Sequence, residues 1–129
     1  MAAAAGTCTV IEEIFDGTKL ISWAWTGGTG ETLLGACTTT NFYNGKLLFC
    51  VTTPSGATVT APADDYDIMI LDKNDIDLLA DNGLNRATGT TESILEASLG
   101  AVANSQLELN ITNSGSAGTE GGYVYVWIR

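Results

Sequence analysis

The chain has 129 residues, of which 45% are hydrophobic and 16% are charged, with 15 acidic residues, 5 basic residues and no histidine. A domain of this length buries a core without help from a metal or a disulfide, and this apolar content excludes a disordered acidic tail. Five cations are too few for the basic patch that nucleic acid or a membrane surface requires, so we expect neither partner. The net charge of −10 favours solubility or a basic protein partner.

The first half of the chain predicts two β-hairpins. Residues 7–15 and 18–26 are rich in β-branched and aromatic residues, and Asp16-Gly17 between them is a type I′ turn signal. Asn44-Gly45 predicts a second hairpin turn that leads into a strand over 46–53. Both faces of that strand are apolar, so we expect it to be central and covered on both sides.

In the second half of the chain, residues for the two faces of a strand alternate. Strands are expected over 66–72, over 106–112 and at the C-terminus, where Tyr123, Tyr125 and Trp127 share one face. Between them, Ser93 and Glu96 have the spacing of a capping box, which predicts a short helix over 93–99.

Short strands separated by frequent turn signals are typical of sandwiches and jelly rolls, and the long crossover helices of a parallel sheet are missing. We therefore predict an all-β fold, an antiparallel, jelly-roll-like β-sandwich with at most one short helix. A single domain would occupy residues 7–129 after a flexible arm at 1–6. That arm has neither the basic residues nor the apolar run of a signal peptide, which predicts a protein made in a cytoplasm.

The chain has three cysteines, Cys8, Cys37 and Cys50. An odd number at wide spacing, with no export signal, does not suggest a disulfide framework. We expect three buried, reduced thiols that act as small hydrophobic residues.

No catalytic motif is found in the sequence. The absence of histidine removes the commonest general base and the commonest metal ligand. The stretch Gly27-Gly28-Thr29-Gly30 superficially resembles a phosphate loop but lacks the Lys-Ser/Thr of a P-loop. We therefore expect no enzyme activity, no cofactor and no catalytic or metal-binding residues.

Acidic residues cluster in one stretch: Asp64, Asp65, Asp67, Asp72, Asp75, Asp77 and Asp81. Three roles are open to them, namely capping of turns through local hydrogen bonds, a weak Ca²⁺ site and carboxylate catalysis. The stretch 72–77 lacks the central glycine and the distal glutamate of an EF-hand loop, which favours turn capping.

Five aromatic residues also have more than one possible role: Trp23, Trp25, Tyr123, Tyr125 and Trp127. Aromatic side chains of this kind fill sandwich cores, form protein interfaces or line sugar-binding platforms. The core and the protein interface are favoured over the sugar platform.

Residues 66–86, YDIMILDKNDIDLLADNGLNR, resemble a group of small tailed-bacteriophage proteins encoded among virion morphogenesis genes. The resemblance continues at Asn44-Gly45-Lys46, in the loop 54–62 and in the strand 107–113, so that it covers about two-thirds of the chain. This chain departs from the family pattern at Asn74-Asp75, where the family usually has a glycine. The resemblance implies a virion structural protein, and within that class an oligomeric capsid decoration (cement) protein that clamps the major capsid protein.

A sandwich strand needs only one apolar face for its own core, so a second apolar face requires a cover. We expect Met69, Leu71, Tyr125 and Trp127 to contact a neighbouring copy, in a homo-oligomer for which a trimer is favoured, or the capsid surface. Such a protein would be assembled in the host cytoplasm and located on the virion. The alternatives are a head-to-tail or tail-fibre component and a carbohydrate-binding β-sandwich module.

Overall fold

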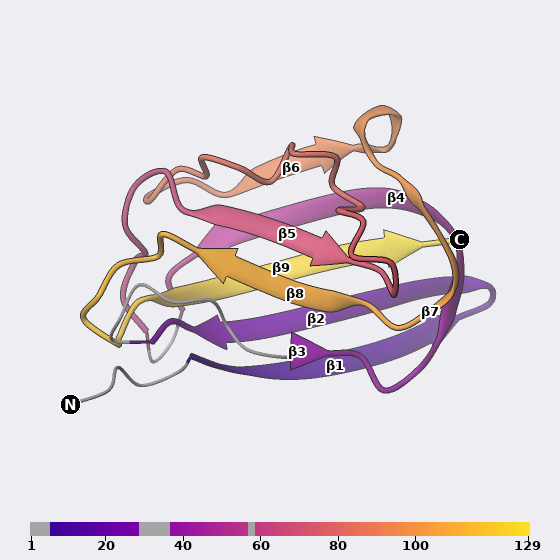
Figure 1. Ribbon diagram of the computed structural model, residues 1–129, viewed down its shortest axis with the longest axis horizontal. Coiled ribbons are helices and arrows are strands. Elements are labelled where there is room, and N and C mark those ends of the chain that lie inside the picture. The colour runs from indigo at the N-terminus through magenta and orange to yellow at the C-terminus, as the bar shows by residue number, and fades with distance from the viewer. Residues whose placement is uncertain (1–5, 29–36, 57–58) are drawn as a thin grey trace.

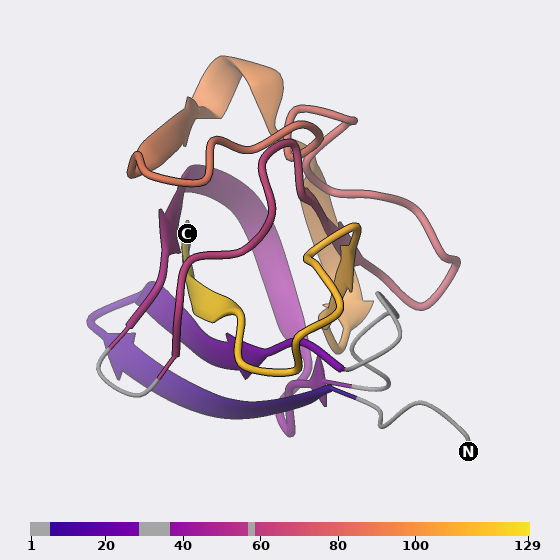
Figure 2. The ribbon, with the colours of Figure 1, turned by 90° about the vertical axis from the view of Figure 1, so that its left-hand side faces the viewer.

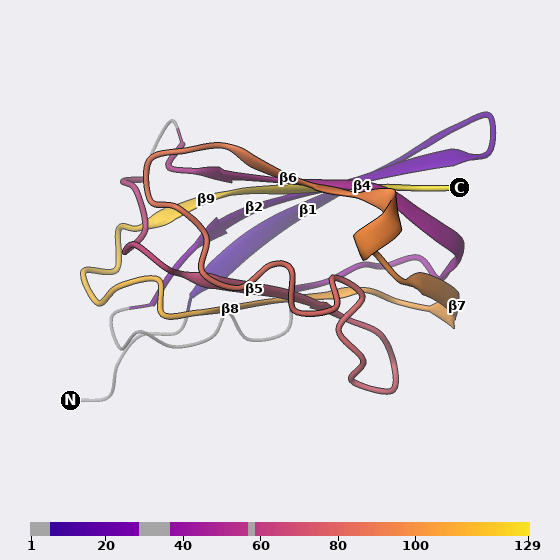
Figure 3. The same ribbon diagram turned by 90° about the horizontal axis from the view of Figure 1, so that it is seen from above.

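The expected all-β sandwich is confirmed. A computed structural model describes residues 6–28, 37–56 and 59–129, and in these residues two antiparallel sheets pack face to face (Figure 1). The view from above separates the two layers (Figure 3), and the view along the sandwich shows the strands of the larger sheet curving around the smaller one (Figure 2).

Six strands form the larger sheet, and three form the smaller one. The larger sheet has the order β1 (Thr7–Phe15), β2 (Thr18–Thr26), β9 (Gly121–Ile128), β4 (Tyr43–Pro54) and β6 (Glu92–Leu95), with β7 (Ala101–Ser105) also paired to β4. The smaller sheet has the order β3 (Cys37–Thr38), β8 (Glu108–Thr112) and β5 (Asp67–Leu71).

Alternate residues of both sheets point into one shared core, as the period of two along a strand requires. Fully buried side chains from the larger sheet include Ile21, Trp23, Trp25, Val124, Val126 and Ile128. Those from the smaller sheet and its flanks include Ile68, Ile70, Leu107, Leu109 and Ile111. The predicted alternation of the second half of the chain is therefore confirmed.

The hairpin at Asp16-Gly17 is also confirmed. Both turn residues have positive φ angles, 41° and 90°, as a type I′ turn requires. The end of this hairpin projects beyond the other strands (Figure 3), so Ile14 and Phe15 are exposed although they belong to a regular strand.

The hairpin predicted at Asn44-Gly45 is wrong. Strand β4 runs through these residues, and Gly45 forms a bulge against β7 with a φ of 133°. A Cβ atom at this position would clash with the carbonyl oxygen of Arg129, so the glycine allows the last residue of the chain to approach closely. The strand is central, as expected, but its outer face is only half-buried.

The helix predicted over 93–99 is likewise wrong. Residues Glu92–Leu95 form strand β6, which pairs with β4, and Glu96–Ser98 form a single 3₁₀ turn, η1. Ile94 lies opposite Cys50 and is buried in the core. Pairing with a long neighbouring strand buries this side chain, and this outweighs the local capping signal.

Two of the three cysteines are paired, which contradicts the expectation of three free thiols. Cys8 of β1 forms a disulfide with Cys37 of β3, with 6.0 Å between their Cα atoms, whereas Cys50 is free and buried. An odd count leaves room for one pair, and the fold brings together two strands that are far apart in the sequence. The disulfide therefore links the two sheets.

Glu12 holds the β3–β4 connection against β1. Its carboxylate accepts hydrogen bonds from the backbone N–H groups of Thr40 and Asn41, at 2.9 and 3.0 Å, and from the Tyr43 hydroxyl at 2.7 Å. Partial burial raises the pKa of Glu12, but these hydrogen bonds together outweigh it and leave the pKa below its usual value. The ionised carboxylate is thus the form that stabilises the fold.

Replacing Glu12 by glutamine should therefore lower the free energy of unfolding by about 1 kcal/mol at neutral pH, because two or three charge-assisted hydrogen bonds are weakened at a half-exposed site. The pKa of Glu12 is lower in the folded state than in the unfolded state, so its hydrogen bonds stabilise the protein fully above about pH 4.3. This stabilisation is lost as the pH falls through the pKa of the folded state. Urea unfolding should thus show a difference between wild type and Glu12→Gln that shrinks below about pH 4.

The control for this experiment is Glu13→Gln, a neighbouring carboxylate that is exposed and accepts no hydrogen bond from the described residues. It should change stability by less than about 0.5 kcal/mol. Equal effects of the two substitutions would mean that the Glu12 contacts do not stabilise the protein.

Candidate binding surfaces

A row of aromatic side chains lies on the outside of the larger sheet. Tyr123, Tyr125 and Trp127 alternate along β9 with buried core residues, and all three are half-buried. Their ring centroids follow one another at 6.0 and 6.4 Å. Phe49 of β4, opposite Trp127, adds a fourth ring at 5.6 Å. We call these four residues the aromatic face.

The neighbouring strands extend this surface on both sides. Leu20 of β2 lies beside Trp127, and Val51 of β4 lies beside Tyr125. At the margins, Leu95 of β6 lies beside Phe49 and is 65% exposed. Ile11 of β1 lies beside Ser22 and is 55% exposed. An uninterrupted apolar row therefore crosses four strands from Leu20 to Leu95, whereas the outward-facing residues of β1 and β2 also include Thr9, Glu13 and Ser22.

The five aromatic residues named from the sequence have separate roles. Trp23 and Trp25 are buried in the core, and the Trp23 indole N–H donates to the backbone carbonyl of Cys37 at 3.2 Å. Tyr123, Tyr125 and Trp127 lie on the outer side. Sequence reasoning did not select Phe49, because both faces of its strand are apolar and only the register with β9 shows which one is outside.

The four residues expected at an interface are distributed over two opposite surfaces. Tyr125 and Trp127 belong to the aromatic face, whereas Met69 and Leu71 are on the outer side of β5 in the smaller sheet, since Ile68 and Ile70 fill the core. A contact that used all four residues would have to involve both sides of the sandwich. That they contact a neighbouring copy or a capsid stays a prediction.

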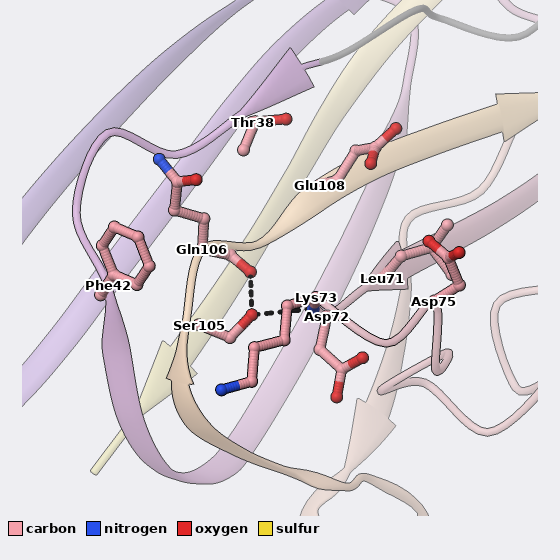
Figure 4. Close-up of a pocket in the computed structure, with 9 residues that line it drawn as sticks. All are labelled: Thr38, Phe42, Leu71, Asp72, Lys73, Asp75, Ser105, Gln106 and Glu108. Atoms are coloured by element: carbon pink, nitrogen blue, oxygen red, sulfur yellow. Dashed lines mark hydrogen bonds between the residues drawn. The ribbon is translucent and has the colours of Figure 1, made fainter.

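A hollow of about 310 Å³ lies at one end of the smaller sheet, on its outer side (Figure 4). Its floor contains the cross-strand row Thr38, Glu108 and Leu71, which are neighbours in register on β3, β8 and β5. Its remaining lining residues come from the end of β7 and from the loops at that end: Ser105, Phe42, Asp72, Lys73, Asp75 and Gln106. We call this hollow the end pocket.

Two carboxylates of the acidic stretch cap turns, as the sequence favoured, whereas those of Asp64 and Asp67 accept hydrogen bonds from residues far away in the chain. One oxygen of Asp72 accepts the N–H groups of Asn74 and Ile76, at 2.8 and 3.0 Å. The Asp77 carboxylate accepts those of Leu79 and Asp81, at 3.0 and 2.9 Å. In residues 6–28, 37–56 and 59–129, no three His, Cys, Asp or Glu side chains are grouped so that they could hold a metal ion.

Two titratable groups lie in the core without an evident chemical role. Burial raises the pKa of the Cys50 thiol to about 12, and burial also raises the pKa of the Tyr66 hydroxyl to about 12. Both groups are therefore neutral near pH 7, and Cys50 is not an activated nucleophile.

The glycine-rich stretch compared with a phosphate loop falls partly outside the described residues, as does the predicted N-terminal arm.

Comparisons with known proteins assign no family to this chain. No protein-family model and no curated protein matches the chain. Among solved structures, the chain is similar to a low affinity xylan binding module, CBM86, from Roseburia intestinalis. The identity is 11%, the match covers 95% of this chain and 85% of that chain, and the TM-score is 0.43. No helix in the described part of this chain has the length and apolarity needed to cross a membrane.

Proposed function

We propose that this chain is a non-catalytic structural subunit of a protein assembly and that a neighbouring protein covers its aromatic face. The observation that carries the proposal is the apolar surface that the aromatic face forms with Leu20, Val51 and Leu95 on the outer side of the larger sheet. Contiguous apolar patches of this kind are rare on monomeric proteins and mark sites of association. Tyr, Trp and Phe are also the residues that interface centres favour.

The resemblance of residues 66–86 to tailed-bacteriophage proteins supports a virion as the assembly and capsid decoration as the role. In that case the aromatic face rests on the major capsid protein or on a second copy of the chain. The copy number in purified particles tests this assignment. A decoration protein is present in hundreds of copies, whereas a head-to-tail or tail-fibre component is present in about a dozen.

Replacing Tyr125 by lysine tests the surface itself. Tyr125 lies at the middle of the aromatic row, and a charge there would have to be desolvated on association. We expect the substitution to weaken binding to particles that lack the protein by about thirtyfold or more, the effect of losing a central aromatic residue. Sedimentation of mixtures at several protein concentrations measures the affinity.

Ser93→Lys is the matched control. Ser93 of β6 pairs with Val51, the neighbour of Tyr125 on β4, and is exposed at the edge of the surface. A rim charge should change the affinity less than about fivefold. Unchanged binding of a folded Tyr125→Lys protein would show that the aromatic face is not the contact surface.

Carbohydrate binding is the second candidate, favoured by one observation: three half-exposed rings follow one another along a single strand. Sugar rings stack on such platforms, but the flanking residues here are aliphatic or carry small hydroxyl groups. Among the described residues that pair across the sheet in line with Tyr123, Tyr125 and Trp127, Glu13 alone is charged. Titration of tryptophan fluorescence with oligosaccharides distinguishes the two candidates, since saturable quenching that Tyr125→Lys abolishes would favour the sugar.

A further inference from the structure

We propose that the end pocket binds an arginine side chain of a protein partner. The pocket lies on the outer side of the smaller sheet, opposite the aromatic face, so this proposal does not depend on the proposed function.

The shape of the end pocket suits one long side chain. Its volume of about 310 Å³ is at the lower end of the range for small-molecule sites. Leu71, 9% exposed, provides an apolar floor, and Phe42 at the margin is 60% exposed. An exposed phenylalanine beside a hollow offers a ring face on which a planar group can stack.

The charge of the pocket selects a cation. Asp72, Asp75 and Glu108 line it together with one basic residue, Lys73, whose ammonium group lies 3.4 Å from the backbone carbonyl of Asn104. Asp72 is engaged in its turn, but the carboxylates of Asp75 and Glu108 accept no hydrogen bond from the described residues. The pocket therefore has an excess of negative charge and two carboxylates available to a ligand.

An arginine side chain matches these features better than a lysine, a metal ion or a neutral sugar. Its guanidinium group is planar, stacks on aromatic rings and donates two parallel hydrogen bonds to a carboxylate. Lysine presents a more strongly hydrated point charge. A metal ion would need several grouped ligands, which the described residues do not provide. A neutral sugar would gain nothing from the excess of negative charge.

The test is a titration of the full chain with N-acetyl-arginine amide at low salt, followed by the backbone amide resonances in NMR spectra. N-acetyl-citrulline amide is the probe of the same shape without the charge, and N-acetyl-lysine amide tests the preference for a guanidinium group. We expect saturable shifts concentrated at residues 71–75 and 105–108 for the arginine derivative, weaker binding of the lysine derivative and none of the citrulline derivative.

The pocket variant is Asp75→Asn with Glu108→Gln, which removes two charges and no hydrogen bond among the described residues. It should bind the arginine derivative about three- to tenfold more weakly, as for the loss of two exposed ion pairs. Lys73→Gln removes the competing cation and should bind about two- to threefold more tightly. The spectra also report whether each variant is folded.

Asp81→Asn with Glu96→Gln is the matched control. Both residues are exposed and lie outside the pocket, and Asp81 has the same left-handed backbone conformation as Asp75, with φ angles of 64° and 60°. This variant should bind the arginine derivative within about twofold of wild type. Three results would overturn the proposal: equal binding of the citrulline derivative, shifts spread over the whole acidic surface, or equal effects of the pocket and control variants.

Discussion

Replacing Trp23 by alanine should lower the free energy of unfolding by about 3–5 kcal/mol, the cost of a large cavity in a close-packed core. Trp23 is fully buried between the two sheets, and its indole N–H is bonded to the carbonyl oxygen of Cys37. The substitution therefore removes both a large apolar contact and a hydrogen bond that ties β2 to the smaller sheet. Small domains have stabilities of about 5–15 kcal/mol, so a loss of this size is a large fraction of the total.

The matched control is Trp127→Ala, the same substitution on the neighbouring strand but on the opposite side of the same sheet. Trp127 is half-buried and contacts Phe49 and Tyr125, so we expect a loss of about 1–2 kcal/mol. Urea unfolding followed by far-UV circular dichroism measures both values, because tryptophan fluorescence changes with the substitution itself. A larger loss for Trp127 than for Trp23 would mean that the two faces of the larger sheet are reversed.

Removing the disulfide by the double substitution Cys8→Ser and Cys37→Ser should lower the stability of the oxidised protein by about 3–4 kcal/mol. The two cysteines are 29 residues apart, and a link across a loop of this length restricts the unfolded chain by about that amount. Urea unfolding of the variant and of the oxidised wild type measures the difference. Reduced wild type should lose nearly the same amount, because reduction opens the same loop.

Thiol labelling tests the pairing directly. A maleimide added to denatured, unreduced protein should add once, at Cys50, and should add three times after reduction. Three additions without reduction would contradict the disulfide and restore the expectation drawn from the sequence. Disulfides are stable in oxidising surroundings and rare in a reducing cytoplasm, so the protein should be purified without added reductant.

The two proposed binding surfaces lie on opposite sides of the sandwich. The aromatic face is apolar and spans β9 and β4, whereas the end pocket is small, acidic and placed at one end of the smaller sheet. A subunit with two such surfaces is able to contact two neighbours at once. The two sets of variants separate these contacts, since Tyr125→Lys leaves the end pocket intact and Asp75→Asn with Glu108→Gln leaves the aromatic face intact.

Several local features were predictable from one strand or one turn. Asp16-Gly17 specifies its hairpin because both residues tolerate a positive φ. The alternation at 107–111 and 123–128 shows which residues share a face because the side-chain period of a strand is two. The capping role of Asp72 and Asp77 is also local, since each carboxylate bonds to backbone groups close to it in the sequence.

Features that depend on distant partners were missed. Gly45 has the sequence context of a turn, but its position beside Arg129 makes it a bulge. Residues 93–96 have the spacing of a helix start, but pairing with β4 makes most of them a strand. In each case pairing with a segment far away in the chain overrides the local signal.

The sequence by itself therefore determined the fold class, most of the strands and the two faces of the final strand, because these follow from the period and composition of single segments. Only the tertiary structure decided which face of the larger sheet is outside, which cysteines meet, and that Leu71 lines a pocket with Phe42 and Glu108. These outcomes depend on register and on the packing of two sheets, which join residues separated by tens of positions. No local pattern in the chain specifies such a pairing.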